Sequence, residues 1–135
     1  MDARKQIGLQ GEKEAASFLR QRGYKIIDHR ARILNGDIDI IALDNRTVVF
    51  VEVRSRTSTK HGHPVETIDS RKKRRIIILA NAYIKQHKLK NCSYRIDVVT
   101  VLFVKSDSRQ KTWWLWRFKK RPLIEHFQNA FDSNA

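Results

Sequence analysis

Three carboxylates lie inside two apolar segments of this chain, and they are the residues best suited to chemistry. Residues 36–56 read G-D-I-D-I-I-A-L-D-N-R-T-V-V-F-V-E-V-R-S-R, which predicts two β-strands separated by a short turn. Asp37 and Asp39 belong to the first strand and Glu52 to the second. A buried carboxylate without a partner is costly, so this pattern favours either ion pairs or a metal site.

Pairing of these two strands as a hairpin would bring Asp39 and Glu52 together. Side chains alternate along a strand, so Glu52 and Arg54 share one face, roughly 7 Å apart. Mg²⁺ binds few protein oxygens and keeps several of its waters, so two carboxylates suit it. The two strands therefore predict a divalent-cation site formed by Asp39 and Glu52.

The segments G-D-I-D-I-I-A and V-F-V-E-V-R-S-R resemble the YraN family of small bacterial proteins. An Asp followed on the next strand by Glu-x-Lys is the pattern of the PD-(D/E)xK nuclease superfamily, to which the YraN family is similar. The likeness covers nearly the whole chain. Outside the two segments it rests on Gly8-x-x-Gly11-Glu12-x-x-Ala15, Lys72, Arg95-Ile96-Asp97 and Asn129-Ala130-Phe131.

The resemblance implies a restriction endonuclease-like core and a divalent-metal-dependent endonuclease acting on DNA, including branched or structured DNA. It implies Mg²⁺ (or Mn²⁺) as cofactor, bound by Asp39, Glu52 and the backbone carbonyl of Val53. Glu12 would assist as a third acid, in an arrangement similar to that of junction-resolving nucleases of the superfamily. Such a metal lowers the pKa of a bound water and offsets charge growing on the phosphate.

Arg54 stands where the superfamily pattern has a lysine. An arginine stays protonated in proteins, so Arg54 is suited to positioning water and stabilising charge but not to accepting a proton. Lys72, on a later helix, is the candidate for the missing group. The alternative is a catalytically inactive protein that binds nucleic acid or docks on the ribosome or another acidic partner. In that alternative Asp39, Glu52 and Arg54 form a buried ion-pair network.

The charge balance separately favours a polyanionic partner. The 135 residues include 28 Lys and Arg against 14 Asp and Glu, a formal net charge of +14, which attracts nucleic acid. The length and the hydrophobic share of 41% predict one globular domain. A single cysteine, Cys92, excludes an internal disulfide. No signal peptide or membrane span is recognisable, so we expect a cytoplasmic protein without membrane contact.

Residues 8–22 predict an amphipathic helix that ends at Gly23. Glu12, Ala15 and Leu19 fall on one stripe of this helix, so Glu12 should face inward near its start. This position suits a third acid beside the hairpin. A carboxylate that complements the helix dipole is the structural alternative.

A second helix is predicted over residues 65–88, with an apolar stripe and five consecutive cations in its first half. Neighbouring cations repel one another along a helix, so the run favours a phosphate backbone opposite it. Lys72 lies one turn before Ile76 and should point partly inward. Lys73 and Arg74 should point outward. The residues expected to bind nucleic acid are Arg56, Arg71, Lys73, Arg74 and Arg75.

Three more strands are predicted, over residues 24–30, 94–104 and 112–118. In the second of them Arg95 and Asp97 share a face, which favours a structural ion pair over a further site carboxylate. The third contains three tryptophans, whose alternation favours core and edge packing over base stacking.

Two remaining segments complete the chain. His61 and His63 lie in a polar loop without partners at zinc-ligand spacing, so a loop beside the cleft is favoured over a zinc site. Pro122 opens a predicted short C-terminal helix.

The predicted order of elements is α-β-β-β-α-β-β-α. This order gives an α/β fold with a central mixed β-sheet flanked by helices. One domain is expected over residues 1–135, with residues 106–135 forming a strand and a short helix that pack on the core. The tryptophan-rich strand offers an interface for a homodimer.

Overall fold

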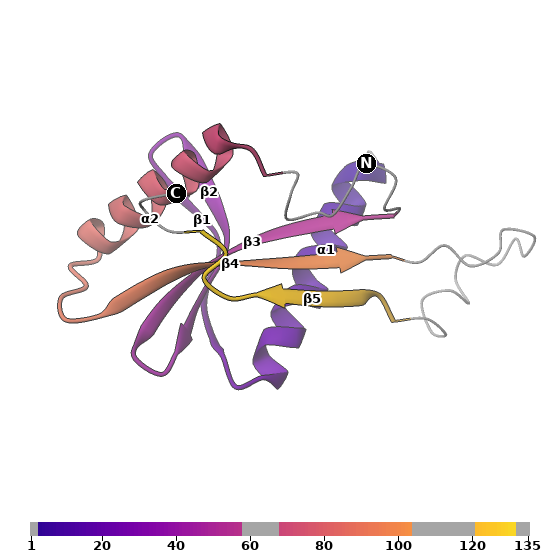
Figure 1. Ribbon diagram of the computed structural model, residues 1–135, viewed down its shortest axis with the longest axis horizontal. Helices are drawn as coiled ribbons and strands as arrows, with labels where there is room; N and C mark the ends of the chain where they lie inside the picture. The colour runs from indigo at the N-terminus through magenta and orange to yellow at the C-terminus, as the bar shows by residue number, and fades with distance from the viewer. Residues whose placement is uncertain (1–2, 58–67, 104–120, 132–135) are drawn as a thin grey trace, which may run out of the picture.

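One mixed β-sheet with a helix on each face organises the protein (Figure 1). The computed structural model describes residues 3–57, 68–103 and 121–131. The elements are α1 (Ala3–Gln21), β1 (Lys25–Ile33), β2 (Gly36–Asp44), β3 (Thr47–Arg56), α2 (Ser70–Gln86), β4 (Ser93–Leu102) and β5 (Leu123–Phe127). The strands lie in the order β1-β2-β3-β4-β5, and only β3 and β4 are parallel. The predicted α/β class with a central mixed sheet is confirmed.

Two apolar cores lie on the two faces of the sheet. Two parallel strands need a crossover connection, and the segment containing α2 makes it between β3 and β4. The core under α2 includes Val48, Phe50, Ile76, Leu79, Tyr83, Ile96 and Val98. The core under α1 includes Ala15, Leu19, Ile40, Val49, Val51, Val99 and Val101. Successive β3 residues therefore face opposite cores, as the alternation of side chains along a strand requires.

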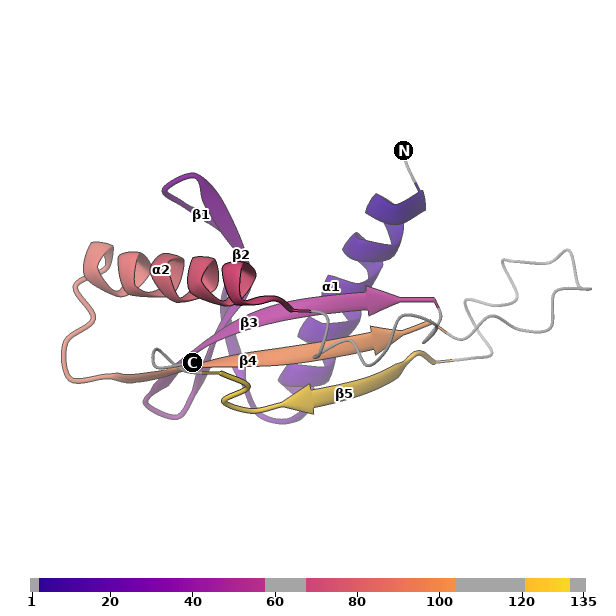
Figure 2. The ribbon, with the colours of Figure 1, turned by 45° about the horizontal axis from the view of Figure 1, so that its top comes forward.

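The pairing of β2 with β3 ends at Ile40 and Val51. Before Ile40, β2 pairs only with β1, and the β1–β2 hairpin rises out of the sheet on the side of α2 (Figure 2). β2 and β3 therefore part at the level of Asp39 and Glu52.

Both helices are present with ends that differ from the prediction. α1 begins at Ala3 rather than at residue 8, because the residues before Gly8 are mostly good helix formers. α2 begins at Ser70 rather than at residue 65. Asp69 is its N-cap and accepts a 2.8 Å hydrogen bond from the Lys72 backbone N–H, which fixes the start of the helix. Residues 65–67 lie outside the described ones.

The C-terminal helix predicted from Pro122 is wrong, because this segment is a strand. Residues Leu123–Phe127 form β5, which pairs antiparallel with β4. Leu123 is 60% exposed, while His126 is buried against the sheet. Five residues are too few for periodicity to separate a helix from a strand, and the edge of β4 supplies the backbone partners that decide it.

Some predictions fall on residues that the structure does not describe. These are the loop with His61 and His63 and the tryptophan-rich strand over residues 112–118. Cys92 is exposed and forms no disulfide. Neither helix of the described chain is long and apolar enough to cross a membrane.

Candidate metal site and basic surface

Asp39 and Glu52 meet where β2 and β3 part. Asp39 and Glu52 are the next residue of each strand beyond the last antiparallel pair, Ile40 and Val51, and the two carboxyl groups interact with each other. Asp39 Oδ2 accepts a 2.8 Å hydrogen bond from the Val53 backbone N–H. In a continuous β2–β3 ladder a backbone carbonyl of β2 would accept this hydrogen bond. Here the side chain of Asp39 accepts it instead.

The surroundings of Asp39, including Glu52, shift its pKa. Burial, and next the charge of Glu52, raise the pKa of Asp39 from 3.8 to about 8, against the opposing hydrogen bond from Val53. The Glu52 side chain is only 9% exposed. Two neighbouring carboxylates in such surroundings are stabilised by a shared proton or by a cation. The site therefore favours a bound positive charge.

Two cationic side chains flank Glu52. Lys72 Nζ lies 3.5 Å from Glu52 Oε1, and Arg54 Nη1 lies 4.0 Å from the same oxygen. Lys72 reaches the sheet from the first turn of α2, in the inward direction that its spacing from Ile76 predicts. The Lys72 side chain is 48% exposed, so solvent reaches the Lys72–Glu52 ion pair from the Lys72 side.

Glu12 approaches this region from α1 but is held by Arg30. Arg30 Nε donates to Glu12 Oε2 over 2.8 Å, and Arg30 Nη2 donates to Oε1 over 3.3 Å. This hydrogen bonding raises the pKa of Arg30. The charge of Glu12 contributes to the raised pKa of Asp39. Within the described chain, no three acidic, His or Cys side chains are grouped closely enough to hold a metal, so Glu12 is not placed as a third ligand.

The groups at Asp39 and Glu52 nevertheless fit a hard divalent cation. The N–H and the carbonyl of one residue point to the same edge of an extended strand. Because the Val53 N–H reaches Asp39, the Val53 carbonyl lies on that same edge of β3. Carboxylate and carbonyl oxygens, with water in the remaining positions, are what Mg²⁺ and Mn²⁺ accept.

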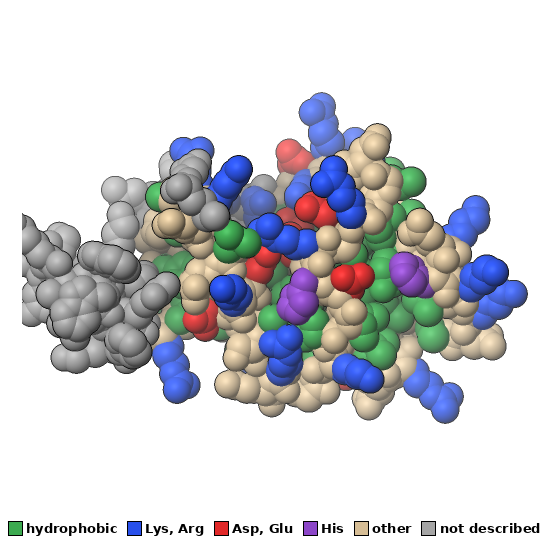
Figure 3. Space-filling model, turned by 180° about the vertical axis from the view of Figure 1, so that it is seen from behind, with side chains coloured by type: hydrophobic (Ala, Val, Ile, Leu, Met, Phe, Trp, Pro, Cys, Tyr) green, Lys and Arg blue, Asp and Glu red, His purple; other side chains and the backbone are tan. Residues whose placement is uncertain are grey.

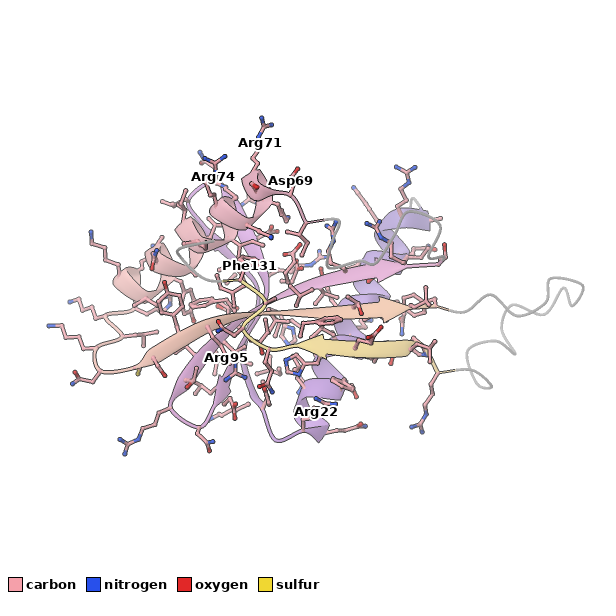
Figure 4. The ribbon with its side chains drawn as sticks, viewed as in Figure 1. Arg22, Asp69, Arg71, Arg74, Arg95 and Phe131 are labelled. Carbon is pink, nitrogen blue, oxygen red and sulfur yellow. The ribbon has the colours of Figure 1, made fainter. Side chains whose placement is uncertain are left out.

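Only part of the basic run on α2 faces solvent. Arg71 and Arg74 are exposed and project away from the sheet (Figure 4). Lys73 does not point outward as predicted, because its Nζ lies 5.8 Å from the centroid of the Phe131 ring and the side chain is half-buried. The attraction between the ammonium group and the ring face accounts for this direction.

Arg75 and Arg56, also expected to bind nucleic acid, are half-buried. A Cβ added at Gly36 would lie 3.3 Å from Arg75 Nη2, so this guanidinium packs against the start of β2. Arg56 is the last residue of β3, and its carbonyl accepts a 2.8 Å hydrogen bond from Phe103 N–H. On the face shown in Figure 3, Lys and Arg side chains project around the outline and also lie near the middle, among acidic side chains.

Residues 11–101 match the profile of a family described as "Uncharacterised protein family UPF0102". The chain belongs to the UPF0102 family. A UPF0102 protein of Persephonella marina is 43% identical over 93% of this chain and 92% of its own. One from Anaeromyxobacter dehalogenans is 36% identical over 99% of this chain and 90% of its own. One from Caldicellulosiruptor saccharolyticus is 42% identical over 73% of this chain and 83% of its own. The YraN-like family predicted from the sequence is thereby confirmed.

This UPF0102 chain has a second polar cluster, centred on Asp97. Arg95 Nε donates to Asp97 Oδ1 over 3.0 Å, which bears out the predicted ion pair. Asp97 also meets His126 Nε2 at 2.7 Å and accepts from the Asn129 backbone N–H at 2.9 Å. Although burial acts in the other direction, these hydrogen bonds lower the pKa of Asp97.

The Asp97 cluster of the UPF0102 chain is separate from the carboxylate pair. Asp97 aligns with Val51 across β3 and β4, and Val51 faces α1, whereas Glu52 faces α2. Asp97 is therefore not a further ligand at the candidate site. Sequence reasoning missed His126, because its segment was predicted to be helical. Ile124 and His126 lie inward between the exposed Leu123 and Glu125, but five residues are too few for this pattern to have identified the strand.

Proposed function

We propose that this protein is a divalent-metal-dependent nuclease that hydrolyses phosphodiester bonds in DNA, including branched or structured DNA. The observation that carries the proposal is the approach of Asp39 to Glu52 at the parted ends of β2 and β3. Lys72 and Arg54 lie beside Glu52, where a phosphate would bring negative charge. When bound, Mg²⁺ or Mn²⁺ supplies Lewis acidity toward the phosphate and lowers the pKa of a water.

Asp39, Glu52 and the Val53 carbonyl are the groups that hold the cation in this proposal. The Val53 N–H donates to one Asp39 oxygen and fixes the orientation of the carboxylate beside Glu52. A ligand held in advance costs less entropy to bind a metal than a mobile side chain does.

Lys72 and Arg54 offset charge on the phosphate and orient the attacking water. Arg54 keeps its charge throughout, so Lys72 is the one of the two able to exchange a proton. Glu12 acts from a distance, through its charge and by holding Arg30. Arg71 and Arg74, with the excess of 14 positive charges, draw the DNA backbone toward the α2 face.

A second candidate is binding of nucleic acid without hydrolysis. The observation in its favour is that Glu52 and Glu12 each already have cationic partners, Lys72 and Arg30. In that case the four side chains are a structural ion-pair network and the basic surface alone carries the function.

Cleavage assays separate the two candidates. Purified protein is incubated with branched, single-stranded and duplex DNA in Mg²⁺, in Mn²⁺ and in EDTA. The nuclease proposal predicts metal-dependent cleavage that Asp39→Asn abolishes. The matched control is Asp37→Asn, which removes an exposed carboxylate two residues away and should cleave normally. DNA binding without cleavage by the wild-type protein would support the second candidate.

A further inference from the structure

An open pocket of about 310 Å³ lies at the C-terminal end of α2, at the opposite end of the helix from Lys72. Three of its six lining residues are lysines, and its apolar part comes from Ile84 and Leu89. The lining residues are Asn81, Ile84, Lys85, Lys88, Leu89 and Lys90. Three lysines beside two apolar residues suit an anion such as a phosphate better than they suit an uncharged ligand.

The backbone that forms this pocket is a helix-ending motif in which glycine is the usual residue. Leu89 N–H donates to Ile84 O over 3.0 Å, and Lys88 N–H donates to Lys85 O over 3.3 Å. Lys88 takes the left-handed conformation, with φ of 51°, at the position after the C-cap His87. Glycine is preferred there because any Cβ is strained. A lysine at this position carries a conformational cost that the end of the helix does not need.

The pocket continues a single exposed stripe along α2. Arg71, Arg74, Ile78, Asn81 and Lys85 are exposed and recur at intervals of three and four residues. Arg71 and Lys85 are 14 positions apart, or about 21 Å at the rise of an α-helix. No cation of this stripe forms an ion pair with another described residue. The stripe thus presents unpaired positive charge at both ends of the helix.

We propose that Lys85, Lys88 and Lys90 form a second phosphate-binding surface, which grips duplex DNA at the end of α2 far from the carboxylates. The inference rests on the proposed function for its choice of DNA as the partner. An extended polyanion can contact positive charges about 21 Å apart on one face at the same time, and a duplex presents phosphates at regular spacing over that length. A small anion would occupy only one end. The second surface sets how the duplex lies on α2 while one strand reaches Asp39 and Glu52.

Replacing Lys88 by glycine gives the sharpest test, because it relieves the backbone while removing the charge. We expect Lys88→Gly to melt at the same or a higher temperature than the wild type. Its affinity for a duplex in EDTA should fall severalfold, and the slope of log K against log salt should lessen by about 1. Unchanged affinity in a stably folded Lys88→Gly protein would overturn the proposal.

A charge-reversal pair supplies the matched comparison. Lys85→Glu with Lys88→Glu should weaken duplex binding about tenfold or more at about 0.1 M salt. Lys13→Glu with Arg20→Glu makes the same charge change at exposed positions of α1, on the other face, and should weaken binding much less. Equal losses in the two pairs would show only a net-charge effect and overturn the proposal. So would polyglutamate that displaces the duplex at equal charge concentration, since it would indicate an acidic protein as partner. Binding in EDTA needs no hydrolysis, so failed cleavage with intact lysine dependence would refute the nuclease and leave this surface standing.

Discussion

Lys72 Nζ lies 3.5 Å from Glu52 Oε1, although the two residues belong to a helix and a strand that are separate in the sequence. Asp69 makes this approach possible, because its cap on the Lys72 backbone N–H fixes the first turn of α2 over the sheet. Arg54 approaches the same oxygen from β3 itself, at 4.0 Å. Two cationic side chains, one from β3 and one from α2, therefore flank the same oxygen of Glu52.

Lys72→Ala should lower the rate of DNA cleavage about a hundredfold, within the range of proton transfer and charge stabilisation by one side chain. Lys72→Arg keeps the positive charge but not the ability to exchange a proton, so it separates these two roles. Lys73→Ala is the matched control, since Lys73 packs against Phe131. Single-turnover cleavage rates of the three variants are the measurement. Equal rates for Lys72→Ala and Lys73→Ala would remove Lys72 from the site.

Asp39→Asn should change how stability depends on pH in metal-free protein. The folded protein holds a proton on Asp39 up to about pH 8, whereas the unfolded chain loses it near 3.8. Between these values the folded state binds more protons, so the free energy of unfolding of the wild type falls as pH rises. Asn keeps an oxygen for the Val53 N–H and removes this dependence.

The advantage of Asp39→Asn should reach about 2 kcal/mol in mildly alkaline buffer, well below the full value of the shift, because Asp39 is only half-buried. This stability advantage should vanish in acid. Urea unfolding in EDTA, repeated from acid to mildly alkaline pH, measures the advantage. A constant difference between the variant and the wild type would contradict the raised pKa that burial and the charge of Glu52 give to Asp39.

Glu12→Gln should affect cleavage more than stability. The Glu12–Arg30 pair is partly exposed, with 51% of the Arg30 side chain accessible, and such pairs contribute about 1 kcal/mol or less. If Glu12 shapes the field at Asp39, cleavage should fall about tenfold, a change of roughly 1.4 kcal/mol in the barrier. Glu14→Gln on the same helix is the control. A change in melting temperature without a change in rate would assign Glu12 a structural role.

Asp97→Asn should destabilise the fold without altering metal binding. Asp97 is fully buried, and removing one partner of a buried ion pair costs about 3–5 kcal/mol. Because the pKa of Asp97 is lowered in the folded state, its contribution is present above 3.8 and is lost as pH falls further. Wild type and variant should therefore converge in stability in acid. Urea midpoints at neutral and acid pH check this, and parallel curves would contradict it.

Local patterns in the sequence predicted most of the strands and helices of this fold. Side chains alternate along a strand, so the sequence alone predicts that Val48, Phe50 and Glu52 share one side of β3 and that Val49, Val51 and Val53 share the other. The pairing of Asp39 with Glu52 followed from the short turn between β2 and β3. The family resemblance located the same residues.

Tertiary partners decided what local patterns could not. β5 is a strand because β4 offers it an edge and Asp97 offers His126 a buried acceptor, and neither partner is near in sequence. Lys73 turns toward the ring of Phe131, which is likewise distant from it in the sequence. The engagement of Glu12 by Arg30 depends on how α1 crosses β1, which no spacing within α1 reveals.

Mn²⁺ binding to the wild type, Asp39→Asn, Glu52→Gln and Asp37→Asn, followed by electron paramagnetic resonance, tests the metal site most directly. The wild type and Asp37→Asn should bind one ion with the same affinity. Asp39→Asn and Glu52→Gln should each bind it at least about tenfold more weakly, because each loses a charged oxygen ligand. Equal affinity in all four proteins would contradict a metal site at Asp39 and Glu52.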